Sequence, residues 1–169
     1  MRTDELLMCV SAMWLCGCTT FSPHGVRNFE QVEPWVFRGG QPTPDGWRFL
    51  VVDQRVRVVV KLDEEHEGSD DYAAALGAKV IKFPISVRQQ LGIDPIDMEA
   101  MMFIAAEAPR TGLYFHCLRG QDRTGLFGAV RRVVVDGWTK GQAEREMLDC
   151  GFHKDLLPGL WAAWKGWEP

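Results

Sequence analysis

The segment of residues 116–125 combines one cysteine, Cys117, with one arginine, Arg123, six positions later. A thiolate is a strong nucleophile, and a guanidinium is a planar fork that can hold two oxygens of an oxyanion such as phosphate. Gly120 lies between the two and permits a tight turn of the backbone. The pattern therefore predicts covalent chemistry on a phosphate group, with Cys117 as nucleophile and Arg123 as the group that holds the phosphate oxygens.

The residues on either side of this segment predict the elements that hold it. Residues 112–116 form an apolar run typical of a strand, and residues 124–136 are compatible with a helix. A strand that enters a tight loop and leaves into a helix N-terminus points successive N–H groups inward and adds the positive end of the helix dipole. We therefore expect an anion cradle in which the N–H groups of residues 118–123 face a phosphate and Cys117 is a thiolate.

Strands and helices are predicted to alternate along the rest of the chain. The strand-like runs are residues 35–38, 57–62, 79–83 and 112–116. The helix-like segments are residues 43–53, 69–76, 94–108, 124–136, 139–150 and 153–164. Such alternation predicts an α/β fold with a central, mostly parallel, twisted sheet and helices on both faces. The anion loop then lies between a strand and a helix, at the carboxyl ends of the strands, where ligands bind in such folds.

The loop also carries a family resemblance. Residues 116–125 match the Cys-x5-Arg-Thr/Ser signature of the protein tyrosine and dual-specificity phosphatase superfamily, including the histidine that precedes the cysteine. The chain resembles the small, atypical bacterial dual-specificity phosphatases from about residue 36 to about residue 164. Residues 37–42 and 79–85 are softer matches.

The resemblance implies hydrolysis of phosphate monoesters through a phosphocysteine, on a phosphorylated protein or a small phosphate ester. It implies that Thr124 hydrogen-bonds the cysteine sulfur and that His116 fixes the loop through its ring. No cofactor is implied, and no metal is expected because the four histidines are scattered and no Cys/His cluster has zinc spacing. The remaining residues expected to bind substrate are Leu118, Arg119, Gly120 and Gln121.

The general acid is less well defined by the sequence. The resemblance implies an aspartate on the loop after the strand at residues 79–83, but residues 84–93 contain no carboxylate. Asp94 is the nearest, although Asp-Pro at a predicted helix start is typical of an N-cap. Asp122, inside the cradle beside Arg123, is favoured, as in myotubularin-like lipid phosphatases, with a loop-bracing role as its alternative. Asp63, after the strand at residues 57–62, is third.

Three other functions remain open. A phosphate-binding pseudophosphatase or lipoprotein adaptor would keep the cradle without a well-placed acid. A phosphoinositide or inositol phosphate phosphatase would use the same loop, although the uncharged Leu118 and Gln121 disfavour highly phosphorylated inositols. Rhodanese or arsenate-reductase chemistry is disfavoured by the His-Cys and Arg-Thr-Gly flanks. Arg38 and Arg119 are expected to add positive potential at the mouth of the site.

Composition limits the remaining properties. A chain of 169 residues with 46% hydrophobic content is long enough for one domain with a substantial core. Its net charge of −4 argues against nucleic acid as a partner, and we expect a monomer. No apolar run is long enough for a membrane span, so contact with a membrane is expected only through an N-terminal lipid anchor.

The N-terminus has the pattern of an export signal. Residues 6–17 are mostly apolar and too short to cross a bilayer, and residues 15–18 resemble a bacterial lipobox ending at Cys18. Acidic residues at positions 4 and 5 depart from the usual positive start. We expect a signal peptide at 1–18, a tether at 19–33 and a phosphatase domain at 34–169. The expected location is the cell envelope or periplasm, lipid-anchored at Cys18, with the cytoplasm as the alternative.

Only two cysteines lie in the predicted domain, Cys117 and Cys150. Two cysteines are too few for a disulfide scaffold. An exported, reactive Cys117 would be open to oxidation, and Cys150 is then either a protective partner or a half-buried cysteine at the end of a helix.

Overall fold

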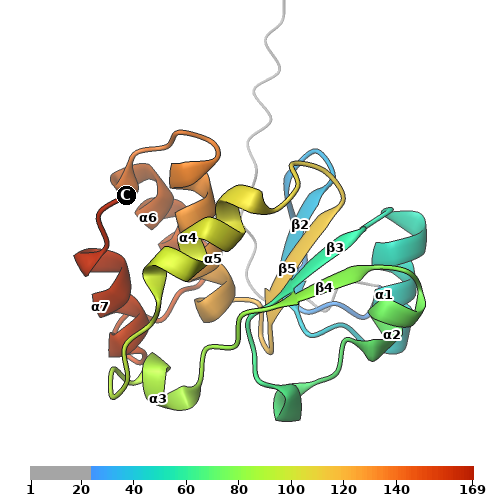
Figure 1. The fold of residues 1–169 in the computed structure, drawn as a ribbon, viewed down its shortest axis with the longest axis horizontal. Helices are drawn as coiled ribbons and strands as arrows, with labels where there is room; N and C mark the ends of the chain where they lie inside the picture. Colours follow the sequence, from blue (N-terminus) through green and yellow to red (C-terminus); the bar gives the residue numbers. More distant parts are fainter. Residues whose placement is uncertain (1–23) are drawn as a thin grey trace, which may run out of the picture.

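The computed structural model describes residues 24–169, which fold around one mixed sheet (Figure 1). The sheet has five strands in the order β1-β2-β5-β3-β4. The strands are β1 (Glu30–Glu33), β2 (Val36–Gly40), β3 (Val58–Lys61), β4 (Lys79–Lys82) and β5 (Leu113–Cys117). β2, β5, β3 and β4 are parallel to one another, and β1 pairs antiparallel with β2 at the edge. The predicted mostly parallel sheet is therefore confirmed.

The helices follow the strands in the expected alternation. They are α1 (Pro44–Arg48), α2 (Asp71–Ala75), α3 (Val87–Gln90), α4 (Met98–Glu107), α5 (Asp122–Val134), α6 (Lys140–Asp149) and α7 (Pro158–Gly166). A π-helical turn, η1 (Phe49–Asp53), continues α1, and a 3-10 turn, η2 (Glu65–Glu67), follows β3. Thr43 and Thr139 accept N-cap hydrogen bonds from Gly46 and Gln142, as their positions predict.

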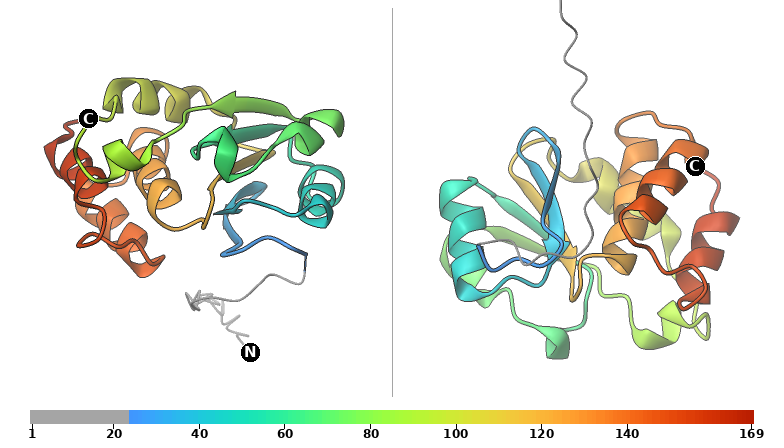
Figure 2. Two further views of the ribbon diagram at one scale, coloured as in Figure 1. Left: turned by 90° about the horizontal axis from the view of Figure 1, so that it is seen from below. Right: turned by 180° about the vertical axis from the view of Figure 1, so that it is seen from behind.

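Helices cover both faces of the sheet, because successive strand residues point to opposite sides. Val59 and Tyr114 face a core made with Trp47 of α1, whereas Val60 and Phe115 face the larger core of the other side. Figures 1 and 2 show α1 on one side and α4 to α7 on the other. Side chains are packed closely in both cores. The carboxyl ends of the parallel strands are therefore held in place from both faces of the sheet.

Residues 30–33 were assigned to a tether by the sequence but form β1 in the structure. Glu30 lies opposite Arg38 and Gln31 opposite Phe37. Three of its four residues are polar, although only Gln31 is exposed, so the strand carries no hydrophobic signal that would reveal it. The predicted signal peptide, the acylation site at Cys18 and residues 19–23 of the tether lie outside the described residues.

The segment after β4 also differs from the prediction. The expected helix at 94–108 begins at Met98, and Asp97 is its N-cap, accepting from Ala100 N at 2.9 Å. Asp94 is therefore not a cap, because the chain offers a second aspartate three residues later. The short helix α3, capped by Ser86, was not predicted.

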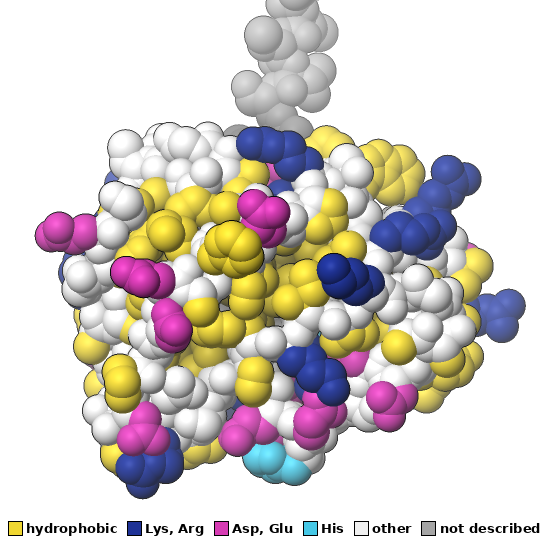
Figure 3. Space-filling model, viewed as in Figure 1, with side chains coloured by type: hydrophobic (Ala, Val, Ile, Leu, Met, Phe, Trp, Pro, Cys, Tyr) yellow, Lys and Arg dark blue, Asp and Glu magenta, His cyan; other side chains and the backbone are white. Residues whose placement is uncertain are grey.

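Apolar side chains gather over the face that carries α4 in the space-filling view (Figure 3). Phe103, a residue of α4, is exposed. Within residues 24–169 none of the helices has the length and apolar character needed to cross a membrane.

Candidate active site

Cys117 is the last residue of β5 and is almost completely buried. Its neighbour across the sheet is Gly40, the last residue of β2. The loop that follows turns back over the sulfur, and Gly120 N–H donates to Cys117 Sγ at 3.3 Å. The amide therefore points into the space that the loop encloses, as an anion cradle requires.

Gly120 is required for this turn for two separate reasons. Its φ of 81° lies in the left-handed region, which side chains disfavour. A Cβ atom at this position would lie 2.3 Å from the carbonyl carbon of Gly39 and 2.4 Å from Gly40 N. The predicted role of Gly120 as the turning point is confirmed, and the loop packs directly on the end of β2.

Arg123 closes the loop in the first turn of α5 and is held by Glu67 of η2. Arg123 Nη1 donates to Glu67 Oε2 at 2.6 Å, and Nη2 donates to Oε1 at 2.8 Å. Arg123 Nη1 also donates to Ile85 O at 3.2 Å. The hydrogen bonds from Arg123 lower the pKa of Glu67 below its ordinary value of 4.5, against the opposing effect of burial.

These contacts leave one edge of the Arg123 guanidinium for a ligand. A guanidinium has five N–H groups, and three of them are used by Glu67 and Ile85. The remaining two, on Nε and Nη2, point in the same direction because the group is planar. They can bind two oxygens of one phosphate side by side.

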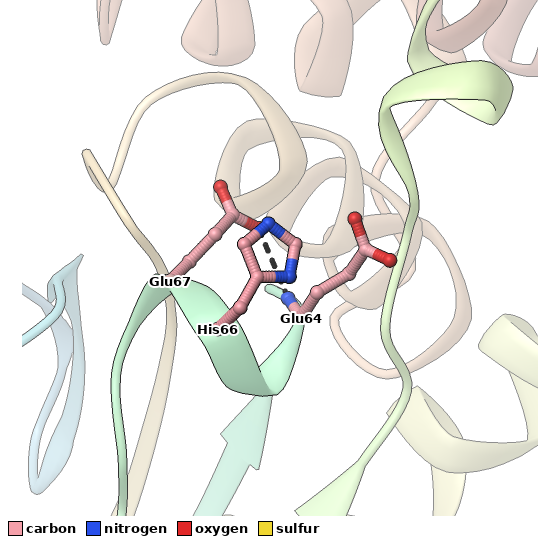
Figure 4. A group of neighbouring side chains, drawn as sticks. All are labelled: Glu64, His66 and Glu67. Atoms are coloured by element: carbon pink, nitrogen blue, oxygen red, sulfur yellow. Dashed lines mark hydrogen bonds between the residues drawn. The ribbon is translucent and has the colours of Figure 1, made fainter.

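Glu67 lies beside two other possible metal ligands on the same turn (Figure 4). One ligand atom from each of Glu64, His66 and Glu67 lies within 4.8 Å of the others, and the His66 ring lies between the two carboxylates. Both oxygens of Glu67 are already bound by Arg123. A cation at this turn would therefore have to compete with the guanidinium, and the geometry favours an Arg clamp over a metal centre.

His116 belongs to a buried network beneath the loop. Its Nε2 lies 3.0 Å from Asp70 Oδ2, and its Nδ1 lies 3.7 Å from Asp63 Oδ1. Lys61 Nζ lies 3.5 Å from Asp63 and 3.8 Å from Asp70, and donates to Gly68 O at 2.7 Å. Asp70 thus fixes the ring of His116. Because His116 precedes Cys117 in β5, this contact also fixes the strand end that carries the cysteine.

The pKa values of the two aspartates in this network shift in opposite directions. Burial raises the pKa of Asp63 above its ordinary value of 3.8, and the charges of His116 and Lys61 offset this only in part. Burial also raises the pKa of Asp70, but hydrogen bonding to His116 and the charges of His116 and Lys61 outweigh it and hold the pKa below 3.8. The contacts of Asp70 with His116 and Lys61 therefore favour the ionised form of Asp70.

Thr124, expected at the cysteine sulfur, and Arg38, expected at the mouth, both lie behind the loop instead. Thr124 is fully buried, and its hydroxyl donates to Gly39 O at 3.4 Å rather than to the cysteine sulfur. Arg38 is also buried and donates to Gly120 O at 3.2 Å and to Gln121 O at 3.5 Å, so its guanidinium lies behind the loop and not at the mouth. Arg119 is exposed.

The three general-acid candidates lie in different environments. Asp122 accepts from His153 N at 2.7 Å and lies 3.0 Å from His153 Nδ1, so the carboxylate is held at the start of α5. Asp94 is exposed and paired with Arg88 Nε at 2.7 Å. Asp63 is completely buried. Only Asp122 belongs to the loop and is also partly exposed.

Sequence reasoning missed Glu67, Asp70 and His153, which hold Arg123, His116 and Asp122. Glu67 is one of four acidic residues between positions 63 and 67, and nothing in the sequence distinguishes it from the others. Asp70 lies in the segment predicted as a helix at residues 69–76, and it makes no side-chain cap hydrogen bond there. The sequence offers only the general rule that a charged side chain needs a partner when it is buried, and this rule does not say which residue the partner is.

Comparison with known proteins agrees with this fold and site. A family model described as a DSP-PTPase phosphatase fused to NAD+ kinase matches residues 21–154. The chain belongs to this DSP-PTPase phosphatase family. Its Cys-x5-Arg loop is therefore the loop of a cysteine-dependent phosphatase family.

Individual curated proteins are similar to this chain at low sequence identity. The dual specificity protein phosphatase TpbA of Pseudomonas aeruginosa is 27% identical over 126 residues, which cover 74% of this chain and 55% of TpbA. The chain thus spans about half the length of this curated relative. The human phosphatidylglycerophosphatase and protein-tyrosine phosphatase 1 is 25% identical over 139 residues, covering 78% of this chain and 68% of that protein. The crystal structure of P. aeruginosa TpbA has the same fold, with a TM-score of 0.65 and 24% identity over 88% of this chain and 94% of that one.

Proposed function

We propose that this chain hydrolyses phosphate monoesters through a covalent phosphocysteine on Cys117. The observation that carries the proposal is the hydrogen bond from Gly120 N–H to Cys117 Sγ at 3.3 Å. An amide directed at the sulfur favours the thiolate, which is the form that attacks. The free edge of Arg123 closes the same loop and supplies two further donors for the phosphate oxygens.

The reaction takes two steps. In the first, the thiolate of Cys117 attacks phosphorus, the bond from phosphorus to the leaving oxygen breaks, and that oxygen receives a proton from the general acid. In the second, a water attacks the phosphocysteine, gives its proton to the same residue, and releases inorganic phosphate and the thiolate. The loop N–H groups and Arg123 stabilise the three equatorial oxygens in both transition states.

Asp122 is the general acid in this proposal. It is fixed by His153 at the entrance to α5, whereas Asp94 is engaged by Arg88 on the surface and Asp63 is closed off from substrate. A general acid must reach the leaving oxygen directly or through one water. Of the three aspartates, Asp122 is the one whose position on the loop supports that contact.

Phosphotyrosine or a dual-specificity protein substrate is the preferred class. TpbA is named a dual specificity protein phosphatase, and a TpbA variant has been crystallised in complex with pTyr. Leu118 and Gln121 make the loop itself less basic than a highly phosphorylated inositol would need. The neighbouring turn adds the carboxylate of Glu64, whose charge repels additional phosphates, whereas Glu65 is paired with Lys82 at 2.6 Å.

A lipid or inositol phosphate is the second candidate class. The human relative is named a phosphatidylglycerophosphatase, and PTPMT1 has been crystallised in complex with PI(5)P. Parallel assays with a phosphotyrosine peptide, phosphatidylglycerophosphate and a phosphoinositide, each ranked by kcat/KM, distinguish the classes. A preference for either lipid would overturn the protein-substrate assignment.

The Cys117→Ser variant tests the proposal as a whole. We expect it to lose turnover of p-nitrophenyl phosphate and still bind an oxyanion such as vanadate, because the cradle is made of backbone N–H groups. Cys150→Ser is the matched control, since Cys150 is the second cysteine of the described residues and its thiol contacts Glu30. Turnover by Cys117→Ser at the wild-type rate would exclude Cys117 as the nucleophile. Wild-type protein that binds phosphate but does not hydrolyse the ester would favour a pseudophosphatase.

We also propose that the domain is carried to the cell envelope or periplasm and anchored there through Cys18, with a cytoplasmic location as the alternative. The apolar run at residues 6–17 and the lipobox-like residues 15–18 support this location.

A further inference from the structure

The backbone carbonyls of the 117–123 loop are held from behind by the segment that precedes α1. Asn28 Nδ2 donates to Arg119 O at 2.8 Å, although the two residues are 91 positions apart. Arg38 Nη2 donates to Gly120 O at 3.2 Å, and Gln41 N donates to Leu118 O at 3.1 Å. Three consecutive peptide groups are thus fixed on the side facing away from the phosphate.

A contact that holds the carbonyl of a peptide group on one side of the loop also directs the N–H of the same peptide group to the other side. A trans peptide is planar, so the C=O of one residue and the N–H of the next point in opposite directions. Because Asn28 holds the Arg119 carbonyl outward, the N–H of Gly120 must point inward. It does so, and it reaches Cys117 Sγ at 3.3 Å. Asn28 therefore acts on the one amide that contacts the nucleophile.

The conformation of Asn28 explains how its amide can reach the loop. Its φ is 47°, in the left-handed region, where asparagine is one of the few residues other than glycine that is readily accommodated. The loop approaches this segment closely: a Cβ atom on Gly40 would lie 2.9 Å from Leu118 O. The glycines at the end of β2 allow the contact, and the Asn28 amide completes it.

We propose that Asn28 is a positioning residue for the phosphatase reaction, supported by Arg38, and that it orients the Gly120 amide toward the Cys117 sulfur and the bound phosphate. The proposal rests on the proposed function. It gives the segment before β1 an indirect role in the site, 89 positions ahead of the nucleophile in the chain. Asn28 does not touch the reacting atoms, and its effect passes through the Arg119–Gly120 peptide.

Two substitutions separate this role from a general effect on folding. Asn28→Gly keeps the backbone conformation accessible and removes the donor. Asn28→Asp keeps the shape and the tolerance of positive φ, but places a carboxylate against the Arg119 carbonyl, so it should be the more damaging of the two. Gln31→Ala is the matched control, because Gln31 is exposed on the neighbouring strand β1.

Three measurements are made on each variant: kcat and KM for p-nitrophenyl phosphate, the dissociation constant for vanadate, and the rate at which iodoacetamide alkylates Cys117 at fixed pH. We expect kcat/KM of Asn28→Gly to fall about 10-fold, with weaker vanadate binding and slower alkylation, since the loss of one hydrogen bond is of that size. Asn28→Asp should fall further, and Gln31→Ala should match the wild type. The midpoint of thermal unfolding should stay close to that of the wild type in all three.

The outcomes separate the two proposals. Normal turnover, vanadate affinity and alkylation in both Asn28 variants would overturn the positioning role, and so would losses that only follow a drop in the unfolding midpoint. If the wild-type protein has no turnover, the proposed function fails, but vanadate binding and alkylation still report whether Asn28 orients the loop. Arg38→Lys provides a second test, because a lysine keeps the charge but cannot reproduce the planar contact to Gly120 O.

Discussion

Glu67 holds Arg123 through both of its carboxylate oxygens, at 2.6 and 2.8 Å. The two residues are 56 positions apart and come from different elements, the turn η2 and the helix α5. This clamp leaves only the Nε and Nη2 edge of the guanidinium for a ligand, so the orientation of the phosphate-binding fork is decided by a residue outside the loop.

The clamp makes Arg123 difficult to replace. Arg123→Lys keeps a positive charge but loses both the paired contact to Glu67 and the fork for phosphate, so kcat should fall by roughly 10²–10³. Steady-state kinetics with p-nitrophenyl phosphate and the vanadate dissociation constant measure the two losses. A rate within about 10-fold of the wild type would contradict the transition-state role given to Arg123.

Glu67 should also make stability depend on pH. Its pKa is lowered below 4.5 by the hydrogen bonds from Arg123, so its contribution to the free energy of unfolding is complete above about pH 4.5 and is lost as the pH falls through the lower value in the folded state. The difference in unfolding free energy between wild type and Glu67→Gln, measured by urea denaturation, should be largest at neutral pH and should narrow in acid. A difference that stays constant with pH would show that the ion pair is not its source.

The effect of replacing Asp122 should depend on the leaving group of the substrate. If it is the general acid, Asp122→Asn slows a poor leaving group such as an alkyl phosphate by roughly 10²–10⁴ and an activated aryl phosphate much less, because the latter departs without a proton. Asp94→Asn is the control, since Asp94 lies on the surface with Arg88. The same dependence in Asp94→Asn, and its absence in Asp122→Asn, would move the acid to the loop after β4.

His153 should share the effect of Asp122. His153→Ala removes the ring contact to Asp122 and leaves the backbone hydrogen bond from His153 N at 2.7 Å in place. We expect a smaller loss for the poor leaving group than in Asp122→Asn, because the backbone hydrogen bond still holds the carboxylate. An unchanged rate for the poor leaving group would show that the ring does not help to position Asp122.

The N-terminus makes a separate prediction. Expressed with its own N-terminus in a bacterial host, the protein should be acylated at Cys18, because residues 15–18 resemble a lipobox after an apolar run. Intact-mass spectrometry of membrane and soluble fractions checks this, with Cys18→Ala as control. An intact Met1 in a soluble cytoplasmic pool would reject export and leave the cytoplasmic alternative.

The sequence by itself determined the features that are local in the chain. The Cys117 and Arg123 spacing, the Gly120 turn and the helix that follows are contained in a short segment, and the structure has them as a strand end, a loop and α5. The α/β alternation was also predictable, because hydrophobic periodicity and helix caps are read over a few residues at a time.

Only the tertiary structure decided which residues hold that segment in place. Glu67 is one of several neighbouring acids, and Asn28 lies in a polar stretch that the sequence assigns to a tether. Their contacts to Arg123 and to the Arg119 carbonyl span 56 and 91 positions. Such contacts depend on the order of strands in the sheet and on the close approach of Gly40 to the loop, which local sequence does not encode. The residues expected to carry out the chemistry therefore lie in one segment, residues 116–125. The geometry of that segment is set by residues that come into contact only when the sheet has formed.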